Sequence, residues 1–131
     1  SVDLSLVDSG GAFALADTAQ TVDFGALSAG QVRSYDTMVR SNDGYRITLQ
    51  SQNAQRLRHL ADPAQQIPYS LTIGGVAVDL TSGAAVQALA SGAVTPAAGD
   101  RLDTKITVGA MSGVEMPGNY RDVITVTVSA Q

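Results

Sequence analysis

The stretch of sequence that decides the fold is Tyr120-Arg121-Asp122-Val123-Ile124-Thr125-Val126-Thr127-Val128-Ser129. One register of this stretch is mainly apolar, and its apolar members are Tyr120, Ile124, Val126 and Val128. A period of two predicts a β-strand with one apolar face. Asp122 falls on the same register, and a buried carboxylate needs hydrogen-bond donors. We therefore expect one long strand over residues 120–129, with Asp122 as a structural hydrogen-bond acceptor near its start.

The same alternation recurs upstream, between turns rich in Gly, Asn and Asp. The further segments expected as strands are residues 31–40, 45–52, 67–73, 76–80 and 101–108. Together with Ile124 and Val126 of the terminal stretch, the residues expected to point inward are Ile47, Leu49, Tyr69, Leu71 and Ile106. Gly74-Gly75 predicts a hairpin between two of them, and Ser41-Asn42-Asp43-Gly44 predicts a second hairpin between residues 31–40 and 45–52. Residues 81–100 are expected to be mostly loop, with a short helix or a weak strand around residues 84–90.

The composition indicates one all-β domain. The chain has 131 residues, about the size of a single domain. Only 15% of the residues are charged, whereas Val, Ile and Thr together number 30. β-Branched residues favour strands, and the near absence of Glu and Lys disfavours helices. We expect residues 1–131 to form a single β-sandwich of seven to nine strands.

Several function classes are excluded or disfavoured by the same counts. The chain has no Cys and one His, His59, so a Cys/His zinc site, a thiol active site and a disulfide are excluded. A net charge of −4 with scattered arginines disfavours nucleic-acid binding. No apolar run is long enough to span a bilayer. We expect His59 to be a surface residue, and we expect neither a cofactor nor a catalytic site, because no acid, base and nucleophile converge.

Four motifs together resemble a known family. They are Thr21-Val22-Asp23-Phe24-Gly25-Ala26-Leu27, Ser41-Asn42-Asp43-Gly44-Tyr45, Ile67-Pro68-Tyr69-Ser70-Leu71 and Pro117-Gly118-Asn119-Tyr120-Arg121-Asp122. In their order and spacing the chain resembles the spore coat protein U domain, a family that contains the pilin subunits of archaic chaperone-usher fimbriae. The resemblance covers most of residues 21–128.

The resemblance implies an immunoglobulin-like, pilin-type β-sandwich that is incomplete and is completed by a donated strand. It further implies a non-enzymatic structural subunit of a bacterial surface fimbria, secreted through the periplasm. The implied partners are neighbouring pilin subunits, a periplasmic chaperone and an outer-membrane usher. One alternative is a tip adhesin domain that binds a surface or glycan through the loops at residues 54–66 and 81–100. A secreted hydrolase is the least favoured alternative.

Two sets of residues are candidates for assembly. The free edge of the terminal strand, with the groove beside it, is assigned to Tyr120, Ile124, Val126 and Val128. An exposed apolar edge favours association unless a strand covers it, and another strand of the same chain is the simpler cover. Residues 1–10 are either a donor strand, which would insert Val2, Leu4 and Leu6 into a neighbour, or the domain's own first strand. Both interpretations remain open from the sequence.

Overall fold

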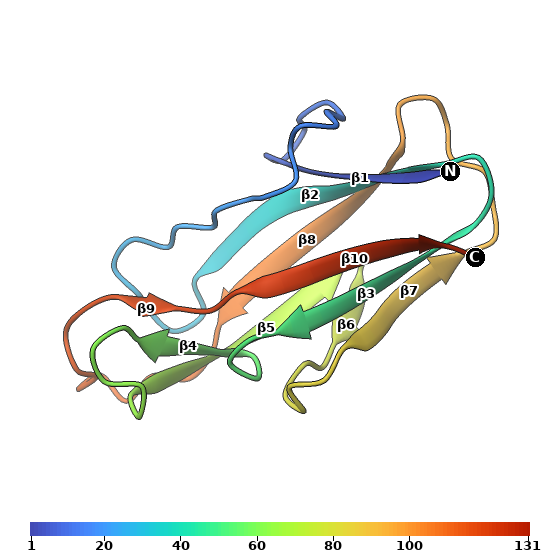
Figure 1. Cartoon of the computed structure of the whole chain (residues 1–131). Coiled ribbons are helices and arrows are strands. Elements are labelled where there is room, and N and C mark those ends of the chain that lie inside the picture. The colour runs from blue at the N-terminus through green and yellow to red at the C-terminus, as the bar shows by residue number, and fades with distance from the viewer.

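Strands joined by turns and loops make up the whole chain. The computed structural model describes residues 1–131 and contains ten strands and no helix (Figure 1). It therefore holds no helix of the length and apolarity needed to cross a membrane. The strands are β1 (Val2–Val7), β2 (Val32–Ser41), β3 (Tyr45–Ser51), β4 (Arg56–His59), β5 (Gln66–Ile73), β6 (Val76–Val78), β7 (Val86–Ser91), β8 (Asp100–Val108), β9 (Tyr120–Arg121) and β10 (Ile124–Ala130).

The strands form two packed sheets, as expected for a β-sandwich. The larger sheet has the order β1-β2-β8-β5-β4-β9, with β6 paired to β5, and the smaller sheet has the order β10-β3-β7. All neighbouring strands are antiparallel. The hairpin at Gly74-Gly75 is confirmed by the β5–β6 pairing, and the weak strand near residues 84–90 is β7.

The core lies between the sheets and follows the predicted alternation. The predicted inward residues that are buried are Ile47, Leu49, Tyr69, Leu71 and Ile106. Two other predicted core residues, Ile124 and Val126, are only half-buried although they pack against this core. Both lie on β10, the edge strand of the smaller sheet. The core is therefore less well covered along β10 than elsewhere.

The predicted hairpin between residues 31–40 and 45–52 is wrong. β2 lies in the larger sheet and β3 in the smaller one, so the turn between them crosses the sandwich. Ser41 Oγ accepts a hydrogen bond from Asp43 N at 3.2 Å and donates one to Gly44 O, also at 3.2 Å. A side chain at Gly44 would collide with the backbone oxygen of Ser91. Turn residues alone do not tell whether the strands that they join will pair.

The single long strand predicted over residues 120–129 is also wrong. The chain leaves β9, which pairs with β4, and enters β10, which pairs with β3 in the other sheet. Asp122 and Val123 between them belong to neither strand. The break occurs where the Asp122 carboxylate turns inward to reach its hydrogen-bond donors. This carboxylate therefore interrupts an otherwise regular alternation of inward and outward side chains.

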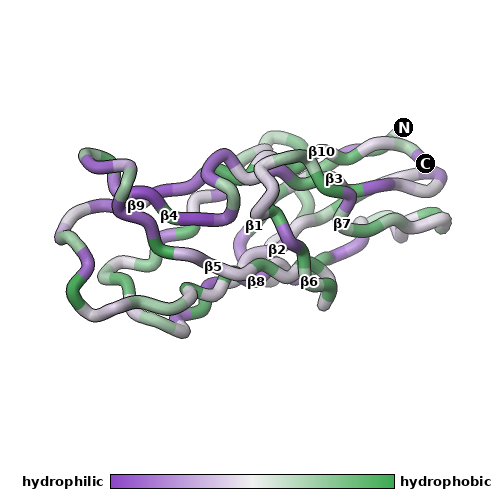
Figure 2. The backbone as a smooth tube through the Cα atoms, turned by 90° about the horizontal axis from the view of Figure 1, so that it is seen from below, coloured by the Kyte–Doolittle hydropathy of each residue, from purple (hydrophilic) through white to green (hydrophobic).

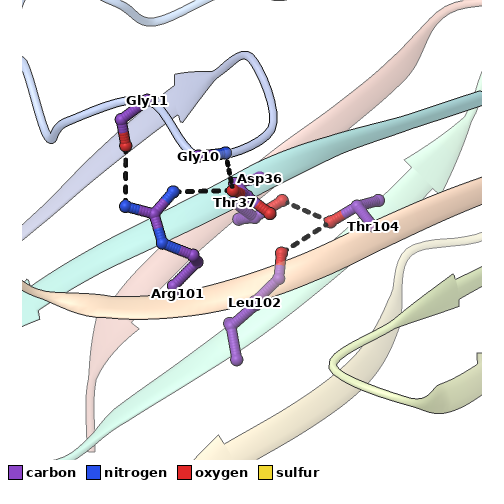
Figure 3. A network of polar contacts seen from close by, with 7 residues as sticks. All are labelled: Gly10, Gly11, Asp36, Thr37, Arg101, Leu102 and Thr104. Atoms are coloured by element: carbon purple, nitrogen blue, oxygen red, sulfur yellow. Dashed lines mark hydrogen bonds and ion pairs between the residues drawn. The ribbon is translucent and has the colours of Figure 1, made fainter.

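The N-terminal segment is held on the larger sheet by its own chain. β1 pairs with β2 over its full length, and residues 11–16 contain no strand. The turn that follows β1 is fixed by the buried Asp36, whose Oδ2 accepts hydrogen bonds from Gly10 N at 2.8 Å and from Arg101 Nη1 at 2.6 Å (Figure 3). Arg101 Nη2 also donates to Gly11 O at 2.8 Å. These bonds connect β1 to both β2 and β8.

Candidate functional site

An open groove runs along one side of the sandwich, where the edges of the two sheets face each other. Its volume is about 970 Å³. One wall is formed by β9 and β10, and the other by residues 18–27 together with Leu4 and Leu6 of β1. Most of the lining residues are hydrophobic. The groove is therefore large enough and apolar enough to receive part of another molecule.

The wall formed by β10 presents an unpaired strand edge. β10 pairs with β3 on one side, and no strand pairs with its other side. Ile124 and Val126 line the groove and are half-buried, whereas Thr125 and Thr127 are exposed. The outer backbone groups of β10 therefore have no ladder partner, and the apolar face beside them is incompletely covered.

The opposite wall is also extended and unpaired. None of the backbone N–H groups of residues 19–24 donates a hydrogen bond within the chain. Val22 and Phe24 are half-buried against the core, whereas Thr21 and Asp23, which alternate with them, are exposed. Gln31 Nε2 holds the end of this wall by donating to Phe24 O at 2.6 Å. This segment has the alternation of a strand and lacks a neighbour to pair with.

The floor of the groove is the hydrophobic core itself. The buried residues that line it come from strands β2, β4, β5 and β8 of the larger sheet and are Tyr35, Leu57, Ile67, Tyr69 and Ile106. In a complete sandwich, such side chains are covered by a strand that closes the edge. The groove between β10 and residues 19–24 therefore leaves part of the hydrophobic core uncovered.

A polar cluster around Asp122 closes one end of the groove. Asp122 Oδ2 accepts hydrogen bonds from Ser51 Oγ and Tyr69 OH, both at 2.5 Å. Asp122 Oδ1 accepts from Asn53 N at 3.0 Å and from Val123 N at 2.8 Å. Because Ser51 belongs to β3 and Tyr69 to β5, the carboxylate joins the two sheets. The expectation that Asp122 is a structural acceptor is confirmed.

Burial and the Asp122 carboxylate raise the pKa of the Tyr69 hydroxyl above its usual value. A tyrosine that loses its proton would place a second negative charge beside the carboxylate, in a poorly solvated position. Tyr69 therefore remains a neutral donor to Asp122 throughout the neutral pH range.

His59 is buried rather than exposed, which corrects the prediction of a surface residue. Its Nδ1 accepts hydrogen bonds from Ala61 N at 3.0 Å and Asp62 N at 3.1 Å, so its Nε2 carries the proton and donates to Pro117 O at 2.8 Å. A side chain at Gly118 would overlap the His59 ring. His59 thus joins the β4–β5 loop to the loop at the end of the groove, a structural role.

The structure brings together most of the residues that the sequence singled out. Tyr120, Ile124 and Val126 line the groove, as do Leu4 and Leu6. Val2 and Val128 pack against the core outside the lining. Their roles in assembly remain predictions.

Sequence reasoning missed the wall at residues 18–27 as part of a site, although the alternation of Val22 and Phe24 with polar residues was a usable signal. Met111, which also lines the groove, lies in a loop where no periodicity marks it. No group of three or more His, Cys, Asp or Glu side chains is arranged to hold a metal ion.

No protein-family model matches the sequence, and no curated protein matches it either. Solved structures do match in fold. The chain aligns over 97% of its length with the CooA pilin subunit from enterotoxigenic Escherichia coli, at a TM-score of 0.58 and 16% identity, and covers 86% of that chain.

Two further matches come from larger chains. The chain aligns over 98% of its length with a chain of the chaperone-tip adhesin complex of CFA/I fimbriae (TM-score 0.63, 14% identity) and covers 43% of it. It also aligns over 98% of its length with a chain of the CsuC-CsuE chaperone-tip adhesion subunit complex from archaic chaperone-usher Csu pili of Acinetobacter baumannii (TM-score 0.52, 16% identity), covering 40% of it. The expected fold is confirmed: the chain is an all-β, immunoglobulin-like sandwich of the pilin type.

The raised pKa of Tyr69 predicts a pH dependence of stability. In the unfolded chain tyrosine ionises near pH 10, whereas in the folded protein it does not, so the free energy of unfolding falls above about pH 10 by up to ~1.4 kcal/mol per pH unit for this group. Tyr69→Phe should remove the part of the slope that Tyr69 contributes, whereas Tyr35 and Tyr45, whose pKa values are also raised, keep theirs. By deleting one hydrogen bond to a carboxylate, the variant should also lower stability at pH 7 by about 1.5–3 kcal/mol. Urea unfolding of both proteins from pH 7 to 11 measures this. An unchanged slope in the variant would contradict the assignment.

Proposed function

We propose that the protein is a structural subunit of a bacterial surface fimbria whose groove receives an extended strand from a neighbouring subunit. The observation that carries the proposal is the pair of facing, unpaired edges, β10 and residues 19–24, with the hydrophobic core between them. A single strand in this gap satisfies the backbone groups of both edges at once. No compact ligand makes the same set of contacts.

The energetics favour a strand with alternating apolar residues. Each apolar side chain that the incoming strand buries contributes about 1.5–3 kcal/mol, and the half-buried Ile124, Val126, Val22 and Phe24 lose their remaining contact with water at the same time. Between these side chains, the incoming backbone pairs with both edges. The fold and the groove together support assembly by strand donation within a chaperone-usher system.

The partners and location follow from this proposal. The proposed partners are neighbouring pilin subunits, a periplasmic chaperone that covers the groove before assembly, and an outer-membrane usher. The proposed location of the assembled protein is the cell surface. Support comes from the matched structures, two of which belong to complexes of a chaperone with a tip adhesin or adhesion subunit. The matched proteins are fimbrial subunits rather than enzymes, which supports a non-enzymatic role.

A tip adhesin domain is the second candidate. The chain spans 43% and 40% of the chains from the two adhesin complexes, so a domain of this kind also occurs within larger proteins. Antibody labelling of fimbriae separates the two candidates, because a shaft subunit is labelled along the whole fibre and an adhesin only at its tip.

We further propose that β1 is the domain's own first strand and not the donor. Its pairing with β2 and the bonds from Asp36 and Arg101 to the turn after it hold it in place. Leu4 and Leu6 then serve as part of the groove wall. The donated strand comes from another segment or another chain.

Filling the groove should stabilise the protein. A peptide of alternating Val and Thr residues should raise the melting temperature, because a ligand at 100 times its Kd adds about 2.7 kcal/mol to the stability of the folded state. Val126→Asp should abolish the effect by placing a charge in the groove. Thr127→Asp is the matched control, because Thr127 follows Val126 and faces outward, and this variant should still be stabilised by the peptide. Differential scanning calorimetry makes the comparison. Equal stabilisation by a scrambled peptide, or equal loss in both variants, would contradict the proposal.

Leu4→Asp tests the role of β1. If β1 belongs to its own domain, the charge disturbs the packing of a half-buried side chain and lowers the free energy of unfolding by about 1–3 kcal/mol. Asp3→Asn, on the exposed face of the same strand, should change it by less than about 0.5 kcal/mol. Urea unfolding followed by circular dichroism gives both values. A Leu4→Asp protein that is as stable as the wild type but fails to assemble would show that β1 is a donor.

A further inference from the structure

Three arginines share the outer face of the sheet formed by β4, β5 and β9. Arg56 and Arg58 alternate along β4 with Leu57 and His59, which are buried on the inner face. Arg58 lies directly opposite Arg121 of β9 in the strand register. This part of the sheet lies at the end of the molecule away from both termini (Figure 1), and its strands β4 and β9 are strongly hydrophilic (Figure 2). We call Arg56, Arg58 and Arg121 the arginine face.

None of these arginines has an acidic partner. The two ion pairs of the protein are Arg101–Asp36 and Lys105–Asp103. Like charges directly opposite each other on antiparallel strands are destabilising. The guanidinium Nε of Arg58 is in addition shielded from solvent without a hydrogen-bond partner. The arginine face therefore lowers stability in the isolated protein, although the protein as a whole carries a net charge of −4.

Arg40 also has a shielded Nε without a hydrogen-bond partner, but its guanidinium group has an aromatic partner. The Arg40 guanidinium lies 4.1 Å from the centre of the Phe13 ring, in a cation-π contact. No ring covers Arg58. The arginine face is thus a cluster of three guanidinium groups that have neither an ion-pair partner nor a cation-π partner in the fold.

The chemistry of the face specifies its partner. Guanidinium groups bind carboxylate, sulfate and phosphate through two parallel hydrogen bonds. Neighbouring positions on a strand face are about 5–7 Å apart, so the three arginines fit a chain of repeated anionic groups. The outward neighbours on β5 are Gln66, Pro68 and Ser70, and the exposed large apolar residue that adjoins the face is Leu60, directly after β4. Protein interfaces have an apolar core and single-stranded nucleic acids need aromatic platforms, so neither suits this face.

We propose that the arginine face binds an acidic polysaccharide, one that carries carboxylate or sulfate groups along an extended chain. This binding site lies on the outer strand face, separate from the loops at residues 81–100. Arg56 and Arg58 lie outside the groove lining, whereas Arg121 also belongs to the groove wall formed by β9. A fimbrial subunit with such a site attaches to acidic glycans as well as to its neighbours.

The test measures binding of the full chain to short oligosaccharides by isothermal titration calorimetry. The probes are a sulfated heparin fragment and a polygalacturonate fragment, which distinguish sulfate from carboxylate recognition. Arg58→Gln/Arg121→Gln should weaken binding at least about tenfold, because two charge-assisted hydrogen-bonding groups are lost. Arg33→Gln/Arg46→Gln, which removes the same charge from other exposed sites, should change it by less than about twofold.

Stability supplies a second measurement. Arg58→Gln alone should raise the melting temperature while weakening binding, because it removes the opposed charge and the shielded Nε. The proposal is overturned if neither oligosaccharide binds, if the control double variant loses as much affinity, or if a poly-glutamate peptide of equal charge binds as tightly. It is also overturned if Arg58→Gln lowers the melting temperature, since Arg58 would then have a structural role.

Discussion

A gap between the outer edge of β10 and the extended segment at residues 19–24 constrains the whole molecule. The outer edge of β10 has no ladder partner and the backbone N–H groups of residues 19–24 donate no hydrogen bond, so the gap between them exposes part of the core from which a sandwich derives its stability. The rest of the chain closes the sandwich everywhere else. β1 is held against β2, and β6 and β7 approach each other on the opposite side. The part of the hydrophobic core that remains open therefore faces one groove, where the proposed donor strand would bind.

Polar contacts hold the groove open. Asp122 joins β3 to β5 at one end, and His59 joins the loops around residues 61 and 117. Asp36 and Arg101 fix the turn after β1, the strand that contributes Leu4 and Leu6 to a wall. Hydrogen bonds of this kind are directional, so they fix the relative positions of the elements that they join around the groove. A groove that is already shaped for its ligand loses less free energy to ordering when a strand binds.

Much of the fold could be predicted from residue alternation, because inward and outward positions follow from the period of a strand. The positions of Leu71 and Ile106 were predicted in this way. Strand partners were harder to predict, because the turn at residues 41–44 has hairpin chemistry and yet crosses between sheets. The wall at residues 18–27 was missed as a site because its role appears only when β10 lies opposite. His59 shares its register with the buried Leu57, and this periodicity indicated burial more reliably than its charged neighbours indicated exposure.

We propose that a donated strand fills the gap between β10 and residues 19–24. Amide hydrogen exchange can detect this, because exchange reports whether individual backbone N–H groups are hydrogen-bonded. The amides of residues 19–24 should exchange fast in the isolated protein and become strongly protected when an alternating apolar peptide is added. Protection already present without the peptide, or amides that stay unprotected at saturating peptide, would contradict the claim.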